Sequence, residues 1–289
     1  METILFRTLS WKTKLLRIEI RFNIGNMAEP FFSVITVCFN ASNNIENCLL
    51  SLYGQTFRNF EHIIQDGYST DKTISKIQHL KDERSLIKSE KDEGIYDGLN
   101  KGITRCSGQY ILILHSDDIL HNKNILKKLF KFIKTNRFPK VILSGIEFFN
   151  RNGNITRRWI PSLPTKKNLK NGWMAPHTGI ILRSDVIKEI GTYDTSFKIS
   201  SDYNYEINLF KLYMSETVIF NSILTKMKTG GISNAGLISK INKTLEDFII
   251  MKRNGLNPFS GIIFKNIRKL NQLTFTNPLG YLNAYLFQK

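Results

Sequence analysis

Apolar residues recur along this chain with two alternating spacings, and the alternation predicts strands separated by helices. Short runs rich in β-branched and aromatic residues, such as SVITVCFN, predict buried strands. Between these runs, apolar residues recur every three or four positions, as on the buried face of a helix. Strands are predicted at residues 33–40, 60–65, 85–90 and 110–115, and helices at 45–53, 74–80, 95–106 and 122–136.

The pattern changes in the second half of the chain. The pair Asn152-Gly153 separates two strand-like runs within residues 141–160, which predicts a β-hairpin. Residues 161–172 predict a loop. We further expect a strand and a short helix within residues 178–191, a helix over 202–213, and basic helical segments from 233 onwards.

Strands that alternate with helices predict an α/β fold with a mostly parallel central sheet and helices on both of its faces. We expect this domain to span residues 28–232. A basic amphipathic arm, residues 1–27, precedes it. A basic helical tail, residues 233–289, follows it.

The composition limits the classes of function that fit. No apolar run among the 289 residues approaches the roughly 18 that a membrane-spanning helix needs. Arg and Lys interrupt the opening segment, so we expect no secretory signal and a cytoplasmic location. Lys and Arg exceed Asp and Glu by 17, which indicates nucleic acid, an anionic lipid surface or a diphosphate substrate as partner. The charge is dispersed along the chain, which disfavours nucleic acid.

Polar and acidic residues gather where the predicted parallel strands end. Asn40 follows the first strand, Asp66 the second, Asp92 the third, and residues 115–118 (His-Ser-Asp-Asp) the fourth. Ligands of a parallel sheet lie beyond the carboxyl ends of its strands, so we expect these side chains to lie close together. Neighbouring carboxylates repel one another unless a cation or hydrogen-bond donors are present, and their oxygen atoms suit Mg²⁺ or Mn²⁺. The sequence therefore predicts a divalent metal at this edge.

Three ordered stretches carry a resemblance to a known family. They are SVITVCFNASNNIENCLLSLYGQTFRNFEHIIQDGYSTDKT, EKDEGIYDGLNKGITRCSGQYILILHSDD and PHTGIILRSDVIKEIGTYDTSFKISSDYNYEINLF. Together they resemble family 2 glycosyltransferases of the GT-A fold, in particular bacterial enzymes of capsule, O-antigen and exopolysaccharide assembly. The resemblance covers most of residues 33–233 and implies a nucleotide-diphosphate sugar as donor.

The resemblance also implies roles at the strand ends. Asp66 stands where the family accepts a hydrogen bond from the ring N–H of the nucleotide base, and Asn40 stands at the edge of base and ribose. A simple turn at Asp66-Gly67 is the alternative for that pair. The donor-binding residues implied by the resemblance are Asn40, Asp66, Asp92, Asp97, Asn100, His115 and Ser116.

Asp117 matches the metal-binding aspartate of the family's Asp-X-Asp signature, where it would hold Mn²⁺ or Mg²⁺ against the donor diphosphate. The first position of that signature is His115, so one carboxylate is absent. Either the metal is held more weakly, or His115 contacts the nucleotide. The alternative for Asp117 and Asp118 is to cap a helix that begins near residue 119.

Asp202 matches the aspartate that acts as catalytic base in inverting members of the family. Direct displacement at the anomeric carbon requires an acceptor hydroxyl that loses its proton as it attacks, and a positioned carboxylate can take that proton. Capping of the helix that begins there is the alternative role. The resemblance further places His177, Gly230 and Gly231 near acceptor or diphosphate, although a structural histidine and a plain Gly-Gly turn are equally open.

Both ends of the chain combine apolar and basic residues at helical spacing. Trp11 and Leu15 share a stripe beside Lys14, and Ile263 lies near Lys265 in the tail. Such helices bind anionic membrane surfaces or pack against their own domain. Because enzymes like these act on polyprenyl-diphosphate-linked glycans, we expect peripheral contact with the inner face of the cytoplasmic membrane.

These features predict an inverting, metal-dependent glycosyltransferase that uses a nucleotide-diphosphate sugar, with UDP as the expected nucleotide. A sugar nucleotidyltransferase is the nearest rival, but CFNASNN lacks the Gly-rich basic loop that such an enzyme carries after its first strand. A nucleic-acid-binding protein would account for the charge but not for Asp66, Asp117 and Asp202. A noncatalytic relative is the third alternative, because His115 replaces a carboxylate.

Overall fold

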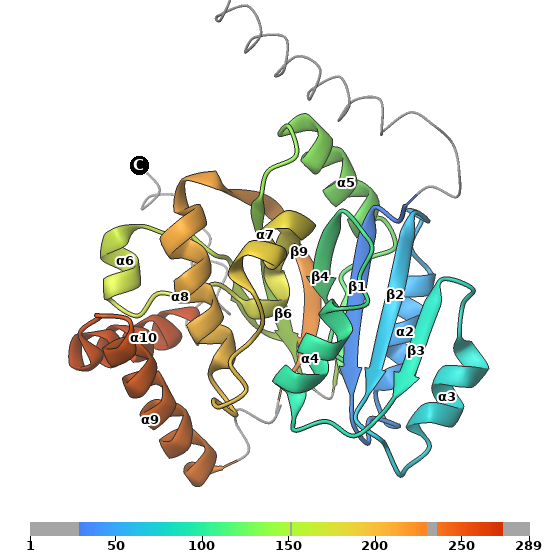
Figure 1. The fold of residues 1–289 in the computed structure, drawn as a ribbon, viewed down its shortest axis with the longest axis horizontal. Coiled ribbons are helices and arrows are strands. Elements are labelled where there is room, and N and C mark those ends of the chain that lie inside the picture. The colour runs from blue at the N-terminus through green and yellow to red at the C-terminus, as the bar shows by residue number, and fades with distance from the viewer. Residues whose placement is uncertain (1–28, 151, 230–235, 274–289) are drawn as a thin grey trace, which may run out of the picture.

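The computed structural model describes residues 29–150, 152–229 and 236–273. Within these residues the core is a nine-stranded sheet in the order β3-β2-β1-β4-β8-β6-β9-β5, with β7 paired to β6 (Figure 1). The strands are β1 Phe32–Cys38, β2 Phe60–Asp66, β3 Ser85–Ser89, β4 Tyr110–Ile113, β5 Asp118–Leu120, β6 Val141–Phe149, β7 Ile155–Trp159, β8 Ile180–Arg183 and β9 Thr217–Lys228.

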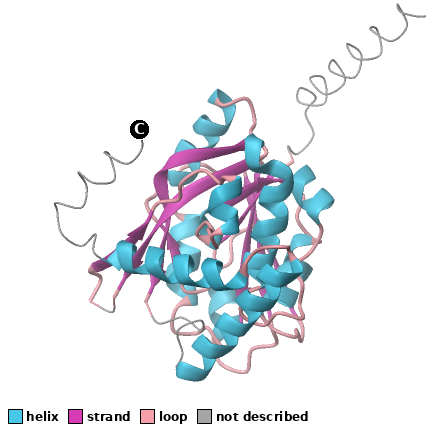
Figure 2. Ribbon diagram, turned by 90° about the vertical axis from the view of Figure 1, so that its left-hand side faces the viewer, coloured by secondary structure: helices cyan, strands magenta, loops and turns pink. Residues whose placement is uncertain are grey.

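Helices cover the sheet, and from the side on which the C-terminal helices lie they stand in front of the strands (Figure 2). The helices are α2 Ile45–Tyr53, α3 Thr73–Leu80, α4 Ile95–Ile103, α5 Ile125–Thr135, α6 Lys166–Lys170, α7 Ser184–Ile190, α8 Ser201–Tyr213, α9 Leu237–Arg253 and α10 Pro258–Leu273, with short 3-10 turns η1 His177–Gly179 and η2 Met214–Glu216.

The first half of the domain is the predicted parallel sheet with a helix layer on each face. β1 pairs in parallel with β2 and β4, and β2 pairs in parallel with β3. Every residue of β1 is buried, because alternate side chains enter opposite layers. Ile35 and Val37 pack with α4, while Phe32 and Val34 pack with α2 and α5. The sheet core and its paired helix layers are therefore confirmed.

Helix α4 lies unusually close to β1 because two of its residues have no side chain. A Cβ on Gly98 would lie 2.6 Å from Val37 Cγ1, and a Cβ on Gly102 would lie 2.8 Å from Ile35 Cγ2. Such distances are shorter than carbon atoms tolerate, so both glycines are needed for this packing. The close approach brings the amino end of α4, which carries Tyr96 and Asp97, up to the end of β1.

The second half of the domain extends the sheet with strands of both directions. β8 joins β4 and β6 antiparallel, β9 joins β6 in parallel, and β5 pairs antiparallel with β9. The predicted hairpin around Asn152-Gly153 is confirmed by the antiparallel pairing of β6 with β7.

Three elements of this half were not predicted. The expected loop 161–172 contains α6, whose first turn is capped by the Thr165 side chain accepting from the Asn168 backbone N–H. β9 is long but its residues are mostly half-buried, so it lacks a strict alternation, and β5 has only three residues. The predicted arm 1–27 lies outside the described residues, as does the end of the tail beyond residue 273.

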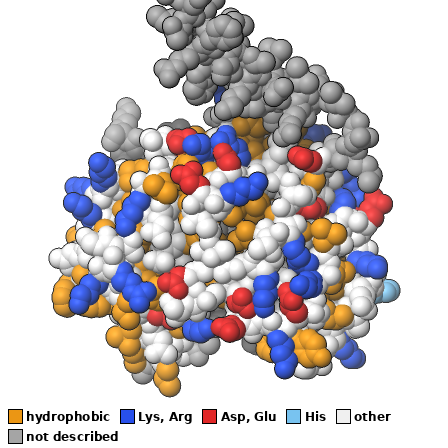
Figure 3. All heavy atoms as spheres, viewed as in Figure 1, with side chains coloured by type: hydrophobic (Ala, Val, Ile, Leu, Met, Phe, Trp, Pro, Cys, Tyr) orange, Lys and Arg blue, Asp and Glu red, His pale blue; other side chains and the backbone are white. Residues whose placement is uncertain are grey.

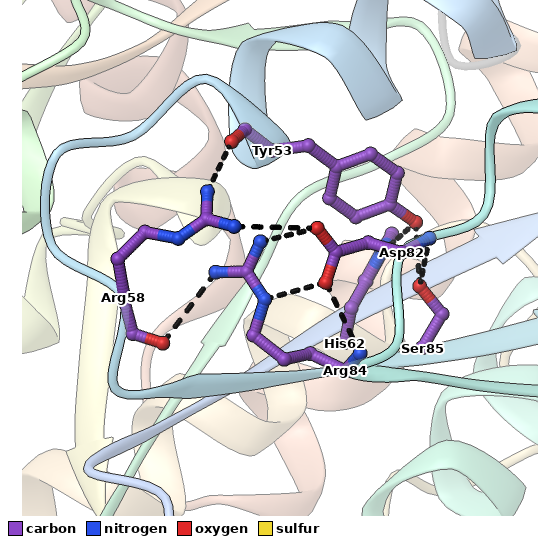
Figure 4. Close-up of polar contacts among 6 residues, drawn as sticks. All are labelled: Tyr53, Arg58, His62, Asp82, Arg84 and Ser85. Atoms are coloured by element: carbon purple, nitrogen blue, oxygen red, sulfur yellow. Dashed lines mark hydrogen bonds and ion pairs between the residues drawn. The ribbon is translucent and has the colours of Figure 1, made fainter.

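A polar network fastens the outer strand β3 to β2 and to the end of α2 (Figure 4). The Tyr53 hydroxyl lies 3.0 Å from His62 Nδ1 and 2.8 Å from Ser85 Oγ. Arg84 donates to both oxygens of Asp82, at 2.6 and 2.5 Å. Burial lowers the pKa of His62 to about 3, so its ring is neutral and joins the network without adding a charge.

Candidate active site

The loops that follow β1 and β2 are tied to each other at the carboxyl edge of the sheet. Asn40, which adopts a left-handed backbone conformation, donates from its backbone N–H to Ser69 Oγ at 2.8 Å. Its side-chain oxygen accepts from the Thr70 N–H at 2.9 Å. Asp71 accepts from the Ser42 N–H at 3.1 Å, which closes the link from the other side. The predicted residue Asn40 therefore lies at the edge where a ligand of a parallel sheet is expected.

Asp66 is fully buried, and its carboxylate is occupied by hydrogen bonds from the protein itself. Oδ2 accepts from the Ser69 N–H at 2.9 Å and from Ser89 Oγ at 2.6 Å, and Oδ1 accepts from Ser69 Oγ at 2.5 Å. A carboxylate with this many donors has little capacity left for a ligand. These hydrogen bonds fit the turn interpretation of Asp66-Gly67, and direct contact with a nucleotide base stays a prediction.

Asp92 takes the space that a side chain at position 67 would need. A Cβ on Gly67 would lie 2.7 Å from Asp92 Oδ2, so glycine is required there for Asp92 to approach the end of β2. Its Oδ1 accepts from the Gly94 N–H at 3.1 Å. Burial raises the pKa of this carboxyl, which indicates that the protein alone compensates its charge poorly. Asp92 is therefore better placed than Asp66 to receive a donor from a ligand.

The other two residues predicted on α4 are engaged within the protein. Asp97 pairs with Lys101 at 2.9 Å and accepts from the Glu93 N–H at 3.0 Å. Asn100 uses both ends of its amide on the backbone of Tyr193, donating to its carbonyl at 2.9 Å and accepting from its N–H at 2.8 Å. These contacts tether α4 to the segment that leads into α8.

The four residues His115 to Asp118 form a tight turn between β4 and β5. The Asp118 N–H donates to the His115 carbonyl at 3.0 Å, which closes the turn. Asp118 is the first residue of β5, so its alternative as a helix cap is wrong. Asp117 instead lines a pocket of about 230 Å³, together with Asn43, Asn44, Asn47, Phe149, Asn150 and Lys228.

Of the two adjacent aspartates, Asp118 has too few hydrogen-bond donors for a buried charge. Asp118 is fully buried, and neither of its carboxylate oxygens has a hydrogen-bond partner among the described residues. Burial and the charge of Asp117 raise its pKa well above the usual range, and burial raises that of Asp117 as well. A cation would relieve both.

The residues present fit a divalent metal only in part. Residues 29–150, 152–229 and 236–273 hold no group of three or more His, Cys, Asp and Glu suited to a metal. Magnesium, however, commonly takes one or two carboxylates and completes its shell with substrate phosphates and water. Burial lowers the pKa of His115 to about 3, so this ring is neutral and does not supply the negative charge of the absent carboxylate.

Asp202 lies in the first turn of α8, beside residues from three other elements. Its Oδ1 accepts from the Tyr203 N–H at 2.8 Å and from the Tyr96 hydroxyl of α4 at 3.2 Å. His177 interacts electrostatically with the Asp202 carboxylate. Its ring stacks on that of His115, with the ring centroids 6.1 Å apart. Ser200, and not Asp202, occupies the capping position of α8. The structure thus brings Asp202, His115 and His177 together.

The charge state of Asp202 is set by opposing effects. Burial alone would raise its pKa, but the positive charges of Lys243 and Lys265, together with His177, hold it below the usual range. The carboxylate is therefore ionised near neutral pH and can accept a proton. The ring of Tyr96 is buried in the core, and its hydroxyl contacts this carboxylate.

Gly230 and Gly231, predicted near the diphosphate, lie outside the described residues. Lys228, two residues before them, is described and donates from Nζ to Asn44 Oδ1 at 3.0 Å. The positive charge of Lys228 partly offsets the rise that burial causes in the pKa of Asp117. Ser116 lies in the turn between His115 and Asp117.

Comparison with known proteins decides the family. A sequence model described as Glycosyl transferase family 2 matches residues 33–191, which is more than half of the chain. The chain belongs to glycosyltransferase family 2. It is therefore an enzyme of glycosyl transfer, which decides against the nucleotidyltransferase and nucleic-acid-binding alternatives.

Relatives of this family 2 glycosyltransferase extend the match beyond the family model. A PGL/p-HBAD biosynthesis glycosyltransferase of Mycobacterium tuberculosis is 28% identical over 217 residues, covering 72% of this chain and 81% of the relative. An uncharacterized glycosyltransferase of Methanocaldococcus jannaschii is 29% identical over 193 residues, covering 64% and 66% of the two chains.

Solved structures share the fold at low sequence identity. S. aureus TarS 1-349 in complex with UDP-GlcNAc has a TM-score of 0.60 at 18% identity, covering 81% of this chain and 70% of that chain. The match covers only 42% of a longer TarS chain. Glucosyl-3-phosphoglycerate synthase from Mycobacterium tuberculosis, solved with Mn²⁺ and UDP, has a TM-score of 0.55 at 16% identity, covering 80% and 81%. The GT-A fold of this family 2 glycosyltransferase is thereby confirmed.

Glu206, one turn after Asp202, gives a pH-dependent prediction. Burial, followed by the charge of Asp202, raises the pKa of Glu206 well above its usual range. The folded state then binds more protons than the unfolded state, so this group's contribution to stability falls as the pH rises above about 4. We expect Glu206→Gln to gain stability over the wild type progressively between pH 4 and pH 8, measured by urea unfolding.

Asp185→Asn is the matched control for Glu206→Gln, because folding lowers the pKa of Asp185 whereas it raises the pKa of Glu206. Hydrogen bonds from Arg183 lower the pKa of Asp185, so its removal should destabilise slightly at neutral pH and not at low pH. Parallel stability curves for the wild type and Glu206→Gln would contradict the assignment.

Proposed function

We propose that this family 2 glycosyltransferase is inverting and metal-dependent, and that it moves a sugar from a nucleotide-diphosphate donor to a lipid-linked oligosaccharide in bacterial surface polysaccharide synthesis. The observation that carries this proposal is the half-buried carboxylate of Asp202, whose pKa is held low, near His115 of the turn that bears Asp117. A proton acceptor and a metal-binding aspartate then serve opposite sides of one reacting carbon. UDP is the expected nucleotide.

Asp202 is the proposed catalytic base. Its carboxylate takes the proton of the acceptor hydroxyl as that oxygen forms a bond to the anomeric carbon of the donor sugar. The bond between the anomeric carbon and the diphosphate oxygen breaks, and its electron pair leaves with the nucleoside diphosphate. A single displacement of this kind inverts the configuration at the anomeric carbon. Tyr96, hydrogen-bonded to Asp202 Oδ1, orients the base.

The donor is proposed to lie along the carboxyl edge of the sheet, with its base near Asn40 and Asp92 and its diphosphate near Asp117. Mn²⁺ or Mg²⁺ held by Asp117 would supply positive charge to the leaving diphosphate. Support comes from the raised pKa of Asp117 and Asp118 and from relatives solved with Mn²⁺ and UDP or with Mn²⁺ and GDP-Man. Asp66, saturated by Ser69 and Ser89, shapes the loop beneath the donor.

Nucleotide binding should therefore depend on metal and on Asp117. A thermal-shift panel of UDP, GDP, CDP and dTDP, each with and without Mn²⁺, is expected to show a metal-dependent increase in melting temperature for one nucleotide, because a ligand of the folded state stabilises it. Asp117→Asn should abolish the metal-dependent part of the shift. Asp185→Asn, a surface substitution remote from this edge, should keep it. A full shift in Asp117→Asn would remove Asp117 from the metal site.

Asp202→Asn tests the base. The substitution preserves size but removes the proton acceptor, so we expect transfer to fall by about 100-fold or more while the metal-dependent nucleotide shift is retained. The measurement is release of the nucleoside diphosphate from the nucleotide sugar whose base the panel selects. Turnover at the wild-type rate would defeat the assignment.

The described helices include none long and apolar enough to cross a membrane. The helix pair α9 and α10 nevertheless presents an apolar surface to solvent, in the region where hydrophobic side chains gather at the lower left of Figure 3. Ile238 is 75% exposed and Leu245 57%, and the rings of Phe248 and Phe259 join the two helices at 5.6 Å. We call the following exposed residues the apolar face: Ile238, Ile241, Leu245, Ile249, Phe259, Ile263, Phe264 and Ile267.

The charges around the apolar face are almost all positive. The two helices contain seven Lys and Arg residues, of which Lys243 and Lys265 point inward, but only two acids, Glu246 and Asp247. Both acids point inward, Glu246 to the backbone before α8 and Asp247 to Lys265. Lys265 is buried in that pair, so it does not serve the surface role that the sequence indicated. An apolar stripe bordered by cations fits an anionic membrane surface, where the lipid-linked acceptor would lie.

Vesicle co-sedimentation of the full chain tests this contact. The double variant Ile241→Asn and Leu245→Asn should bind vesicles of phosphatidylcholine and phosphatidylglycerol about tenfold or more weakly, because it lacks two apolar side chains that the bound protein would bury in the membrane. Leu50→Asn, an exposed leucine on α2, is the control and should bind like the wild type. Equal binding by all three proteins would show that the apolar face does not contact the membrane.

A further inference from the structure

We propose that Glu246 and Lys243 of α9 are positioning residues for Asp202. They fix the segment that leads into α8, and this segment places Asp202. The inference rests on the proposed function, because it takes Asp202 as the base. Both residues lie outside residues 33–191, the part of the chain that the family model matches. Helix α9 packs against α8 in the C-terminal part of the fold (Figure 1).

Glu246 binds three consecutive backbone N–H groups. Its Oε1 accepts from the Lys198 N–H at 2.9 Å, and its Oε2 accepts from the N–H groups of Ile199 at 2.9 Å and Ser200 at 2.7 Å. Ser200 stands at the capping position of α8 but makes no side-chain capping hydrogen bond. A carboxylate from another helix therefore fixes the backbone that leads into α8, including the N–H of the capping residue itself, and its charge also suits the positive end of α8.

The peptide groups next to Ile199 are held from two sides. Glu246 accepts from the Ile199 N–H, while the Ile199 carbonyl accepts from the Tyr96 hydroxyl at 2.8 Å. The same hydroxyl is 3.2 Å from Asp202 Oδ1. Tyr96 has one proton to share between the two oxygens, so a shift of the Ile199 carbonyl would change its contact with Asp202. Glu246 is thereby connected to the base through the backbone of Ile199 and the phenol of Tyr96.

Lys243 adds a second connection from the same helix. Its Nζ donates to Ser200 Oγ at 3.3 Å, and its charge lowers the pKa of Asp202. The buried pair of Lys265 and Asp247, 2.8 Å apart, anchors α10 to α9, and Lys265 Nζ lies 3.7 Å from the ring centroid of Tyr203.

Further groups interact electrostatically with Asp202 from the other elements around it. The groups are Tyr96 of α4, His115 of the turn after β4, His177 of η1, Tyr193 before α8, Glu206 of α8, Lys243 of α9 and Lys265 of α10. Lys243 and Lys265 are the lysines among them, and they come from the two C-terminal helices. These helices thus supply both the anchor and the cationic charge that keep the base in place and ionised.

Glu246→Ala tests the anchor. Amide hydrogen exchange at Ile199 and Ser200 should become faster, because their N–H groups lose an acceptor. In the hydrolysis of the nucleotide sugar selected by the nucleotide panel, kcat should fall by about 10- to 100-fold, while KM for the donor stays the same because donor contacts are intact. Glu246→Gln retains the shape and one acceptor oxygen, so it should recover part of both effects even if Glu246→Ala folds poorly.

Lys243→Met tests the charge. Loss of this cation should move the acidic limb of the pH profile of kcat/KM to higher pH, because the pKa of Asp202 rises. Lys243→Arg should restore the wild-type profile. The matched control is Lys240→Met, an exposed lysine one turn earlier on α9, which should leave the profile unchanged.

The outcomes separate this inference from the proposed function. If Asp202→Asn turns over like the wild type, the base assignment fails. If Asp202→Asn is inactive while Glu246→Ala keeps the wild-type kcat and amide protection, the positioning role of Glu246 fails alone. An unmoved acidic limb in Lys243→Met overturns the role of Lys243.

Discussion

A carboxylate removed from water is stable only when hydrogen-bond donors or positive charge replace the lost hydration, and the arrangement of this site depends on how each acid meets that condition. Asp66 is satisfied by the Ser69 N–H and hydroxyl of its own loop and by the Ser89 hydroxyl of the neighbouring strand β3. Glu246 is satisfied by three backbone N–H groups, and Asp202 is kept ionised by lysines. Asp118 has no such partner among the described residues. The satisfied acids shape the protein, whereas Asp118, next to the proposed metal ligand Asp117, has carboxylate oxygens without a partner among the described residues.

This difference explains why the sequence predicted the edge of the sheet at which the site lies, but not which of its acids are held by the protein and which are free for a ligand. Strand ends concentrate polar residues at one edge, so Asn40, Asp66, Asp92 and Asp117 could be selected from the strand pattern and the family resemblance. Which acid is free for a ligand depends on donors such as Ser89, which follows from strand pairing and not from local sequence. The same holds for Gly67, whose missing side chain makes room for Asp92.

The fold was predictable where burial on both faces enforced a pattern. Every residue of strands β1, β2 and β4 is buried because both faces of the sheet are covered, and β1 and β4 are largely apolar for this reason. Helix α4 fits its face of the sheet through two glycines. Strand β9 was not predicted, because its mostly half-buried residues show no strict alternation of apolar and polar side chains. Helix α6 was not predicted, because its capping threonine follows a proline-rich stretch. Contacts such as Tyr96 with Asp202, between residues about a hundred positions apart, leave no trace in local spacing.

The two sides of α9 carry different proposed tasks, and helical geometry makes this compatible. Ile238, Ile241, Leu245 and Ile249 follow one stripe, whereas Lys243, Glu246, Asp247 and Ile250 follow the opposite one. Glu246 is therefore withdrawn from the surface by the contacts that fix the entry of α8, and Asp247 by its pair with Lys265, which leaves the outer side of α9 without acids. A helix bound to the membrane on its outer side and to the Asp202 segment on its inner side would hold the base at a defined height above the lipid head groups. That geometry suits an acceptor whose reactive hydroxyl is presented on a lipid anchor.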